Sequence, residues 1–184
     1  STRRHYLNQR NCMMVMLENG VIPIVNENDT VSVTELMFTD NDELSGMIAS
    51  MMDVQALIIL SNIEGIYDGA PSVPDTKVIR EVESGKDLSD YIQTEKSGFG
   101  RGGMLTKTAI ARKVADEGIS VIIANGKKDN ILLDLLEHPE TTVCTRFIPT
   151  QGDVSSVKKW IAHSGGFAKG ELHLNEKAVT VLRG

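Results

Sequence analysis

Ala56-Leu-Ile-Ile-Leu60 is the stretch from which the fold can be inferred, because five apolar residues stand in a row with Ser61 and Asn62 directly after them. A short, uninterrupted apolar run is typical of a strand in a parallel sheet that is buried on both faces. Ser120-Val-Ile-Ile-Ala124 has nearly the same character. We therefore predict two buried strands, each followed by a polar loop at the sheet edge where open α/β sheets bind ligands.

Segments with helical character alternate with these strands. One covers residues 104–117 and stops at Gly118, and another covers residues 3–19 and stops at Gly20. The other predicted elements are strands at 21–25, 31–38 and 142–147, a helix that begins near 42, and helices at 87–93 and 130–137. This alternation predicts an α/β domain with a mostly parallel open sheet.

The composition narrows the classes of function. The chain has 184 residues, of which 41% are hydrophobic, and a formal net charge of −6. That length allows one domain with a small appendage. The negative charge argues against nucleic acid and against an anionic membrane surface as partners. No apolar run approaches the ~20 residues of a transmembrane helix and no signal peptide is visible, so we expect a cytoplasmic protein.

Cysteines and histidines give no sign of a metal centre. Cys12 and Cys144 are too few for a disulfide framework or a four-thiolate zinc site. Each lies in an apolar run, so we expect two buried thiols in a reducing compartment. The four histidines lack ligand spacing, and we predict no metal site built from protein ligands.

Amides and carboxylates are concentrated in two segments, Asn26-Glu-Asn-Asp29 and Asp40-Asn-Asp42. The segments come together if residues 30–39 fold back as a hairpin. Such a group suits the ammonium and carboxylate groups of a small amino acid. The carboxylates could also hold a cation or orient a lysine, and ordinary turn and capping chemistry is the plain alternative.

Gly98-Phe-Gly-Arg-Gly-Gly103 is a glycine loop directly before the 104–117 helix. No strand precedes it and the acid expected further along is missing, so it is not a dinucleotide fingerprint. Gly102 and Gly103 let backbone N–H groups approach an anion at the positive end of the helix. Lys107, one turn into the helix, can reach the same anion. We predict a phosphate site, with a flexible surface loop as the alternative.

Three motifs, in their order and spacing, resemble the amino-acid kinase family: Ile24-Val-Asn-Glu-Asn-Asp29, Thr39-Asp-Asn-Asp42 and Gly102-Gly-Met-Leu-Thr-Lys107. Within the family they resemble the branch that phosphorylates the side-chain carboxylate of L-glutamate in proline synthesis. The resemblance implies an αβα sandwich that uses Mg-ATP. The lack of a histidine or cysteine constellation is consistent with this reaction, because a carboxylate is already a nucleophile at neutral pH.

The resemblance also implies roles for individual residues. Glutamate would be contacted by Asn26, Asp29 and Asn41. Lys107 would stabilise the phosphoryl group in transfer, and Asp42 would organise the active-site lysines. The ATP site would be formed by residues from two segments: Ser61, Asn62, Arg101, Gly102, Gly103, Met104 and Lys107.

The resemblance covers about residues 1–147, followed by a predicted linker at 148–165, and residues 166–184 resemble the start of a β-rich PUA domain. Asn62 and Arg101 stand where the family usually has Asp and Thr. The family's N-terminal glycine-rich strand and serine loop have no counterpart here, so we expect this chain alone to be inactive. Relatives form dimers or tetramers and are often inhibited by proline, which leads us to expect a homo-oligomer.

Two other functions stay open. A kinase acting on acetylglutamate, aspartate, a nucleotide or carbamate would share the fold, although the Asn26–Asp29 segment favours free glutamate. A non-catalytic module would be a different class, either an amino-acid sensor or an RNA-binding piece that uses the PUA-like tail. Binding to RNA would be recognised by a steep dependence of affinity on salt.

Overall fold

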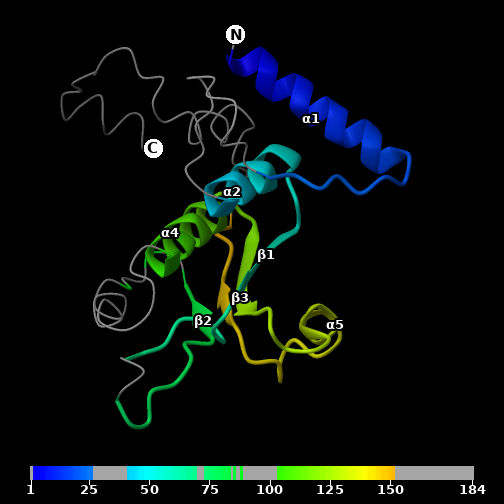
Figure 1. Ribbon diagram of the computed structural model, residues 1–184. Coiled ribbons are helices and arrows are strands. Elements are labelled where there is room, and N and C mark those ends of the chain that lie inside the picture. Colours follow the sequence, from blue (N-terminus) through cyan, green and yellow to red (C-terminus); the bar gives the residue numbers. More distant parts are fainter. Residues whose placement is uncertain are drawn as a thin grey trace, which may run out of the picture.

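The computed structural model describes residues 2–26, 41–69, 73–83, 85, 88 and 103–151 (Figure 1). The helices are α1 (Thr2–Glu18), α2 (Asn41–Met52), α4 (Gly103–Asp116) and α5 (Ile131–Glu137). The strands are β1 (Ala56–Ser61), β2 (Glu81–Val82), β3 (Ser120–Asn125) and β4 (Thr145–Phe147). The strand predicted at 31–38, most of the helix predicted at 87–93, the glycine loop before Gly103 and the tail after residue 151 lie outside the described residues.

The described strands form one sheet in the order β1-β3-β4-β2. β1 pairs with β3 in parallel, with Ala56 opposite Ser120 and Ser61 opposite Asn125. β2 also pairs in parallel with β4, whereas β3 and β4 are antiparallel. Two of these three pairings are parallel, which confirms the prediction of a mostly parallel sheet.

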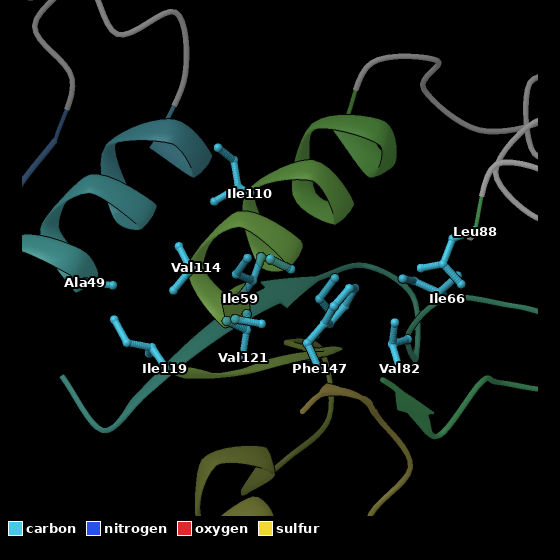
Figure 2. Close-up of a cluster of buried hydrophobic side chains, with 13 residues drawn as sticks. Ala49, Ile59, Ile66, Val82, Leu88, Ile110, Val114, Ile119, Val121 and Phe147 are labelled. Atoms are coloured by element: carbon cyan, nitrogen blue, oxygen red, sulfur yellow. The ribbon is translucent and has the colours of Figure 1, made fainter. Parts of the chain in front are cut away.

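Helices cover both faces of this sheet. Successive side chains of a strand point to opposite faces. Val121 and Ile123 of β3 belong to a large buried cluster with residues of α2 and α4 (Figure 2). Ile122 and Ala124, which alternate with them, belong to a smaller cluster with residues of α5. Full burial of a Val or Ile side chain contributes about 1.5–3 kcal/mol. The helix–sheet–helix layering predicted for the kinase domain is therefore present.

The helix ends follow local rules that were readable in the sequence. Gly20 after α1 has φ 73° and Gly118 after α4 has φ 89°, the left-handed conformation that glycine adopts without steric cost. The predicted helices at 3–19, 104–117 and 130–137 are confirmed within a residue or two at each end. Among the helices of the described residues, none is both long enough and apolar enough to cross a membrane.

The prediction of a strand at 21–25 was wrong. This segment is irregular, and Ile22 and Ile24 are 81% and 96% exposed. Its run of Val and Ile has β character, but Pro23 has no N–H group to donate to a ladder. Backbone groups of a strand also need a neighbour for their hydrogen bonds, and no strand of the described residues pairs with this segment.

Other predictions about burial and length need correction. In β1 only Ile59 is buried and Leu60 is 45% exposed, because β1 has a single neighbour in the described sheet. Cys12 on α1 is exposed, so only Cys144 is the buried thiol that we predicted. The strand predicted at 142–147 begins at Thr145, since the hydroxyl of Thr142 donates a 2.7 Å hydrogen bond to a carbonyl just after α5.

Candidate active site

The N-termini of α2 and α4 lie at the same edge of the sheet. α2 leads into β1 through residues 53–55, and α4 leads into β3 through residues 117–119. Each helix runs back along the strand that follows it, so the start of the helix lies near the end of that strand. β1 and β3 are parallel, and their C-terminal ends therefore share one edge. In open α/β sheets this is the edge at which ligands bind.

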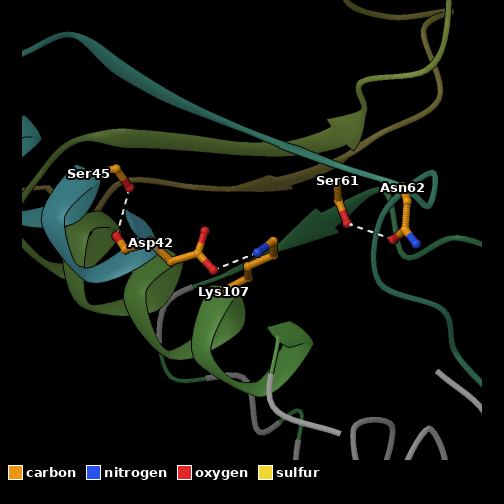
Figure 3. A network of polar contacts seen from close by, with 5 residues as sticks. All are labelled: Asp42, Ser45, Ser61, Asn62 and Lys107. Carbon is orange, nitrogen blue, oxygen red and sulfur yellow. Dashed lines mark hydrogen bonds and ion pairs between the residues drawn. The ribbon is translucent and has the colours of Figure 1, made fainter. Parts of the chain in front are cut away.

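Asp42 and Lys107 meet at this edge. The ammonium of Lys107 donates a hydrogen bond to Asp42 Oδ2, with Nζ and Oδ2 2.5 Å apart (Figure 3). The two residues are 65 positions apart in the sequence, so the packing of α2 against α4 is what brings them together. The side chain of Lys107 is 20% exposed and that of Asp42 is 19% exposed, which leaves the pair accessible to a ligand.

Local structure explains why the pair is well placed. Asp42 stands in the first turn of α2, where the helix dipole favours a carboxylate. The hydroxyl of Ser45 donates a 2.7 Å hydrogen bond to the backbone carbonyl of Asp42 (Figure 3). Further along α2, Gly46 lies against α4, and a Cβ built there would be 2.7 Å from Ile110 Cγ2. The missing side chain therefore lets the two helices approach closely.

Asn26 and Asn41 are also in contact. Nδ2 of Asn41 donates a 3.0 Å hydrogen bond to Oδ1 of Asn26. Asn41 is the first residue of α2 and immediately precedes Asp42, so this amide pair adjoins the ion pair in the chain. The prediction that the two polar segments come together is thus confirmed for these two residues. Asp29 lies outside the described part of the chain.

The residues expected to contact ATP are described in part. Ser61 is the last residue of β1, and its hydroxyl donates a 3.5 Å hydrogen bond to Oδ1 of the adjacent Asn62 (Figure 3). Gly103 and Met104 are the first two residues of α4, whose leading N–H groups have no partner within the helix. Arg101 lies among the residues that are not described, as does Gly102.

A polar cluster that sequence reasoning did not assign lies just after β1 and β3. Glu64 accepts a 3.1 Å hydrogen bond from Nδ2 of Asn125 and forms an ion pair with Lys128. Burial opposes ionisation of Glu64, but the hydrogen bonds from Lys128 and Asn125 and the charge of Lys128 outweigh it and lower the pKa. The sequence feature that could have indicated this cluster is Asn125, a polar residue directly after the apolar run 120–124 and opposite Ser61 in register.

The described residues contain no group of three or more His, Cys, Asp or Glu side chains that could hold a metal ion. Asp42 contributes a carboxylate to the site, and its contact with Lys107 matches one use that the sequence suggested for the carboxylates, which is to orient a lysine. A cationic group beside the start of a helix is suited to an anion such as a phosphate. The geometry is therefore that of an anion site next to a pair of amides.

The sequence profile of the amino acid kinase family matches residues 1–125, and the chain belongs to that family. The chain is similar to the glutamate 5-kinase of Bacteroides thetaiotaomicron, with 79% identity over 182 residues that make up 99% of this chain and 51% of that protein. It is 49% identical to the glutamate 5-kinase of Chlorobaculum tepidum, over 98% of this chain and 49% of that protein. The chain thus spans about half the length of these relatives.

Solved structures support the same fold at low sequence identity. UMP kinase from Ureaplasma parvum matches with a TM-score of 0.53 and 17% identity, over 76% of this chain and 52% of that one. Carbamate kinase from Giardia lamblia bound to AMP-PNP matches with a TM-score of 0.50 and 22% identity, over 77% of this chain and 50% of that one. These likenesses concern the arrangement of helices and strands.

Proposed function

We propose that this protein transfers the γ-phosphoryl group of ATP to the side-chain carboxylate of L-glutamate. The observation that carries the proposal is the contact of Lys107 with Asp42 at the ligand-binding edge of the sheet, with the Asn26–Asn41 pair next to it in the chain. The relatives named glutamate 5-kinase support glutamate rather than acetylglutamate, aspartate, a nucleotide or carbamate as the acceptor.

The amide pair would bind the amino acid. Asn26 and Asn41 each offer a carbonyl oxygen, which can accept from the ammonium of glutamate, and an NH₂ group, which can donate to its α-carboxylate. Both side chains are exposed and lie at the start of α2. Asp29, from the same motif as Asn26, would add a carboxylate for the ammonium. This arrangement would leave the side-chain carboxylate of glutamate free to react.

Lys107 would carry the catalytic step. An oxygen of the glutamate carboxylate attacks the γ-phosphorus, the bond from the γ-phosphorus to the β–γ bridging oxygen breaks, and ADP leaves with the electron pair. No proton has to be removed from the nucleophile. The ammonium of Lys107 would neutralise the charge on the phosphoryl oxygens in transfer, and Asp42 would hold that ammonium in place.

The nucleotide would lie between the end of β1 and the start of α4. Ser61, Asn62, Gly103 and Met104 are the described residues assigned to this site, and Arg101 and Gly102 complete the assignment. The N–H groups at the start of α4 fit phosphate oxygens, as does Lys107. Mg²⁺ usually takes one or two carboxylates together with nucleotide phosphates, so ATP itself would supply much of its coordination. Bound Mg²⁺ supplies further neutralisation of phosphate charge.

The test is ADP formation by the intact protein with L-glutamate, N-acetylglutamate, L-aspartate, UMP and carbamate as acceptors. We expect turnover with L-glutamate and a loss of turnover in Lys107→Ala. Titration of Mg-ADP, with and without L-glutamate, would show whether Lys107→Ala weakens nucleotide binding. Turnover with another acceptor and none with glutamate would refute the assignment of the substrate.

The remaining assignments are part of the same proposal. Residues 1–147 would form most of a kinase domain, residues 148–165 a linker, and residues 166–184 the beginning of a PUA-like domain. The protein would act in the cytoplasm as a dimer or tetramer and would be inhibited by proline. Gel filtration with light scattering and an assay with added proline test the last two. The chain by itself would be inactive, and glutamate-dependent turnover by these 184 residues would refute that.

A further inference from the structure

The loop that follows β1 is held at three points. The carbonyl of Ser61 accepts a 2.8 Å hydrogen bond from the N–H of Gly126. At the far end of the loop, the N–H of Ile66 donates a 2.8 Å hydrogen bond to Oγ1 of Thr145. Gly65 is pressed against the same residue, since a Cβ there would lie 2.4 Å from Thr145 Oγ1. The side chain of Glu64 makes the third attachment.

Glu64 joins the loop to the residues after β3. Its Oε1 accepts from Nδ2 of Asn125 at 3.1 Å, and its Oε2 pairs with the ammonium of Lys128. The carbonyl oxygen of the Asn125 side chain accepts a 3.0 Å hydrogen bond from the N–H of Lys127. The Asn125 amide is therefore turned so that its NH₂ group faces Glu64. The side chain of Glu64 is 27% exposed.

The three attachments differ in what a substitution can change. Those at Ser61 and Ile66 involve backbone groups of the loop, and only Glu64 uses a loop side chain. Glu64 lies two residues after Asn62, so the turn that carries Ser61 and Asn62 is enclosed between the Gly126 contact and the Glu64 contact. Loss of the Glu64 contact would free the turn at one side while β1 and β3 stay paired.

We propose that Glu64 is a positioning residue for nucleotide binding, which orients the Ser61–Asn62 turn through its contacts with Asn125 and Lys128. The inference rests on the proposed function, because it takes the end of β1 as part of the ATP site. The hydrogen bond and the ion pair of Glu64 are with Asn125 and Lys128, after β3, and not with Asp42 or Lys107. Its removal therefore weakens nucleotide binding and leaves the neutralisation of the transferred phosphoryl group unchanged.

The experiment compares four variants of the intact protein: Glu64→Gln, Lys128→Met, the charge exchange Glu64→Lys with Lys128→Glu, and Lys127→Met as the matched control. Lys127 is exposed and contributes its backbone N–H to the contacts described above. Steady-state kinetics gives kcat and the KM for ATP and for glutamate. Thermal unfolding reports the melting temperature of each variant.

We expect Glu64→Gln and Lys128→Met to raise the KM for ATP about three- to tenfold, the loss that corresponds to a partly exposed, hydrogen-bonded ion pair. The kcat and the KM for glutamate stay within about twofold of the wild type, since the Asp42–Lys107 pair is untouched. The charge exchange restores the KM for ATP only in part, because a lysine at position 64 pairs with a glutamate at position 128 but cannot accept from Nδ2 of Asn125, and Lys127→Met leaves the KM unchanged. A purely structural role would raise both KM values and lower the melting temperature together.

An unchanged KM for ATP in Glu64→Gln would overturn the inference, and so would an equal rise of both KM values. If the proposed function itself is wrong, the wild type shows no glutamate-dependent turnover, which is a different result. In that case the dissociation constant of Mg-ADP, measured by titration on the same variants, decides the inference. A dissociation constant that rises in Glu64→Gln and falls part of the way back in the charge exchange supports it, and equal affinities refute it.

Discussion

α2 and α4 are joined by a polar contact at each end, and the two contacts differ in burial. At their N-termini, Asp42 and Lys107 form an ion pair with side chains that are 19% and 20% exposed. At their C-termini, the hydroxyl of Ser50 donates a hydrogen bond to the carboxylate of Glu117. Those two residues are 3% and 7% exposed.

The difference in burial indicates that the two contacts have different roles, one in chemistry and one in folding. An ion pair that water can reach contributes about 0–1 kcal/mol to stability, so Asp42 and Lys107 are free to serve a ligand. A buried polar group that loses a partner costs about 1–3 kcal/mol, so Ser50 and Glu117 serve the packing of the helices. α1 is attached at the same buried end, where Arg10 Nε donates a 3.1 Å hydrogen bond to the carbonyl of Met51.

The largest expected effect is that of Lys107→Ala on catalysis. Removal of a cation that neutralises charge in the transition state lowers kcat by about 10²–10³-fold. The free energy of unfolding, measured in urea, changes by less than about 1 kcal/mol because the pair is partly exposed. Lys113→Ala, on the same helix, is the control and keeps its activity. A loss of less than tenfold in Lys107→Ala would remove Lys107 from the catalytic role.

Asp42→Asn is expected to have the next largest effect. The amide keeps the size of the side chain but no longer attracts the ammonium of Lys107. A misplaced catalytic group costs up to about 10²-fold, so we expect kcat to fall about tenfold to hundredfold. The melting temperature stays close to that of the wild type. If kcat were unaffected, Asp42 would not be what holds Lys107 in place.

At the buried contact between Ser50 and Glu117 we expect the reverse, a loss of stability with no change in kcat. Ser50→Ala takes one hydrogen-bond partner from Glu117 and lowers the free energy of unfolding by about 1–3 kcal/mol. The kcat of the folded enzyme is unchanged, because the contact lies at the opposite end of α2 from Asp42. Ser45→Ala, in the partly exposed first turns, costs less than about 1 kcal/mol. Equal losses of stability in both serine variants would contradict the comparison.

The smallest expected effect concerns Tyr6 of α1. Burial and, to a smaller extent, the negative charge of Glu117 raise the pKa of the Tyr6 phenol, against the opposing charge of Arg10. A pKa that is higher in the folded state means that the folded protein keeps the phenol proton of Tyr6 up to a higher pH than the unfolded chain does. Stability therefore falls as the pH rises above about 10. Tyr6→Phe flattens this alkaline decline in a pH series of thermal unfolding. An unaltered slope would argue against the raised pKa.

Much of the fold was predictable because it depends on local pattern. The apolar runs at 56–60 and 120–124 form β1 and β3, and the helix at 104–117 forms α4. Gly20 and Gly118 end their helices with the positive φ that few other residues tolerate. Lys107 was predicted at an anion site from its place one turn after Gly103, and the resemblance to a family identified Asp42 as the residue that orients the active-site lysines.

Only the tertiary structure decided which residues meet and which are covered. Residues 21–25 have the composition of a strand but remain irregular, and Cys12 is exposed although it lies in an apolar run. The contact between Ser50 and Glu117 joins residues 67 positions apart, and that between Glu64 and Asn125 joins residues 61 positions apart. An amino-acid sequence determines local conformation through short-range sterics and periodicity. Burial and polar contacts over such separations depend on how whole elements pack, which no local pattern records.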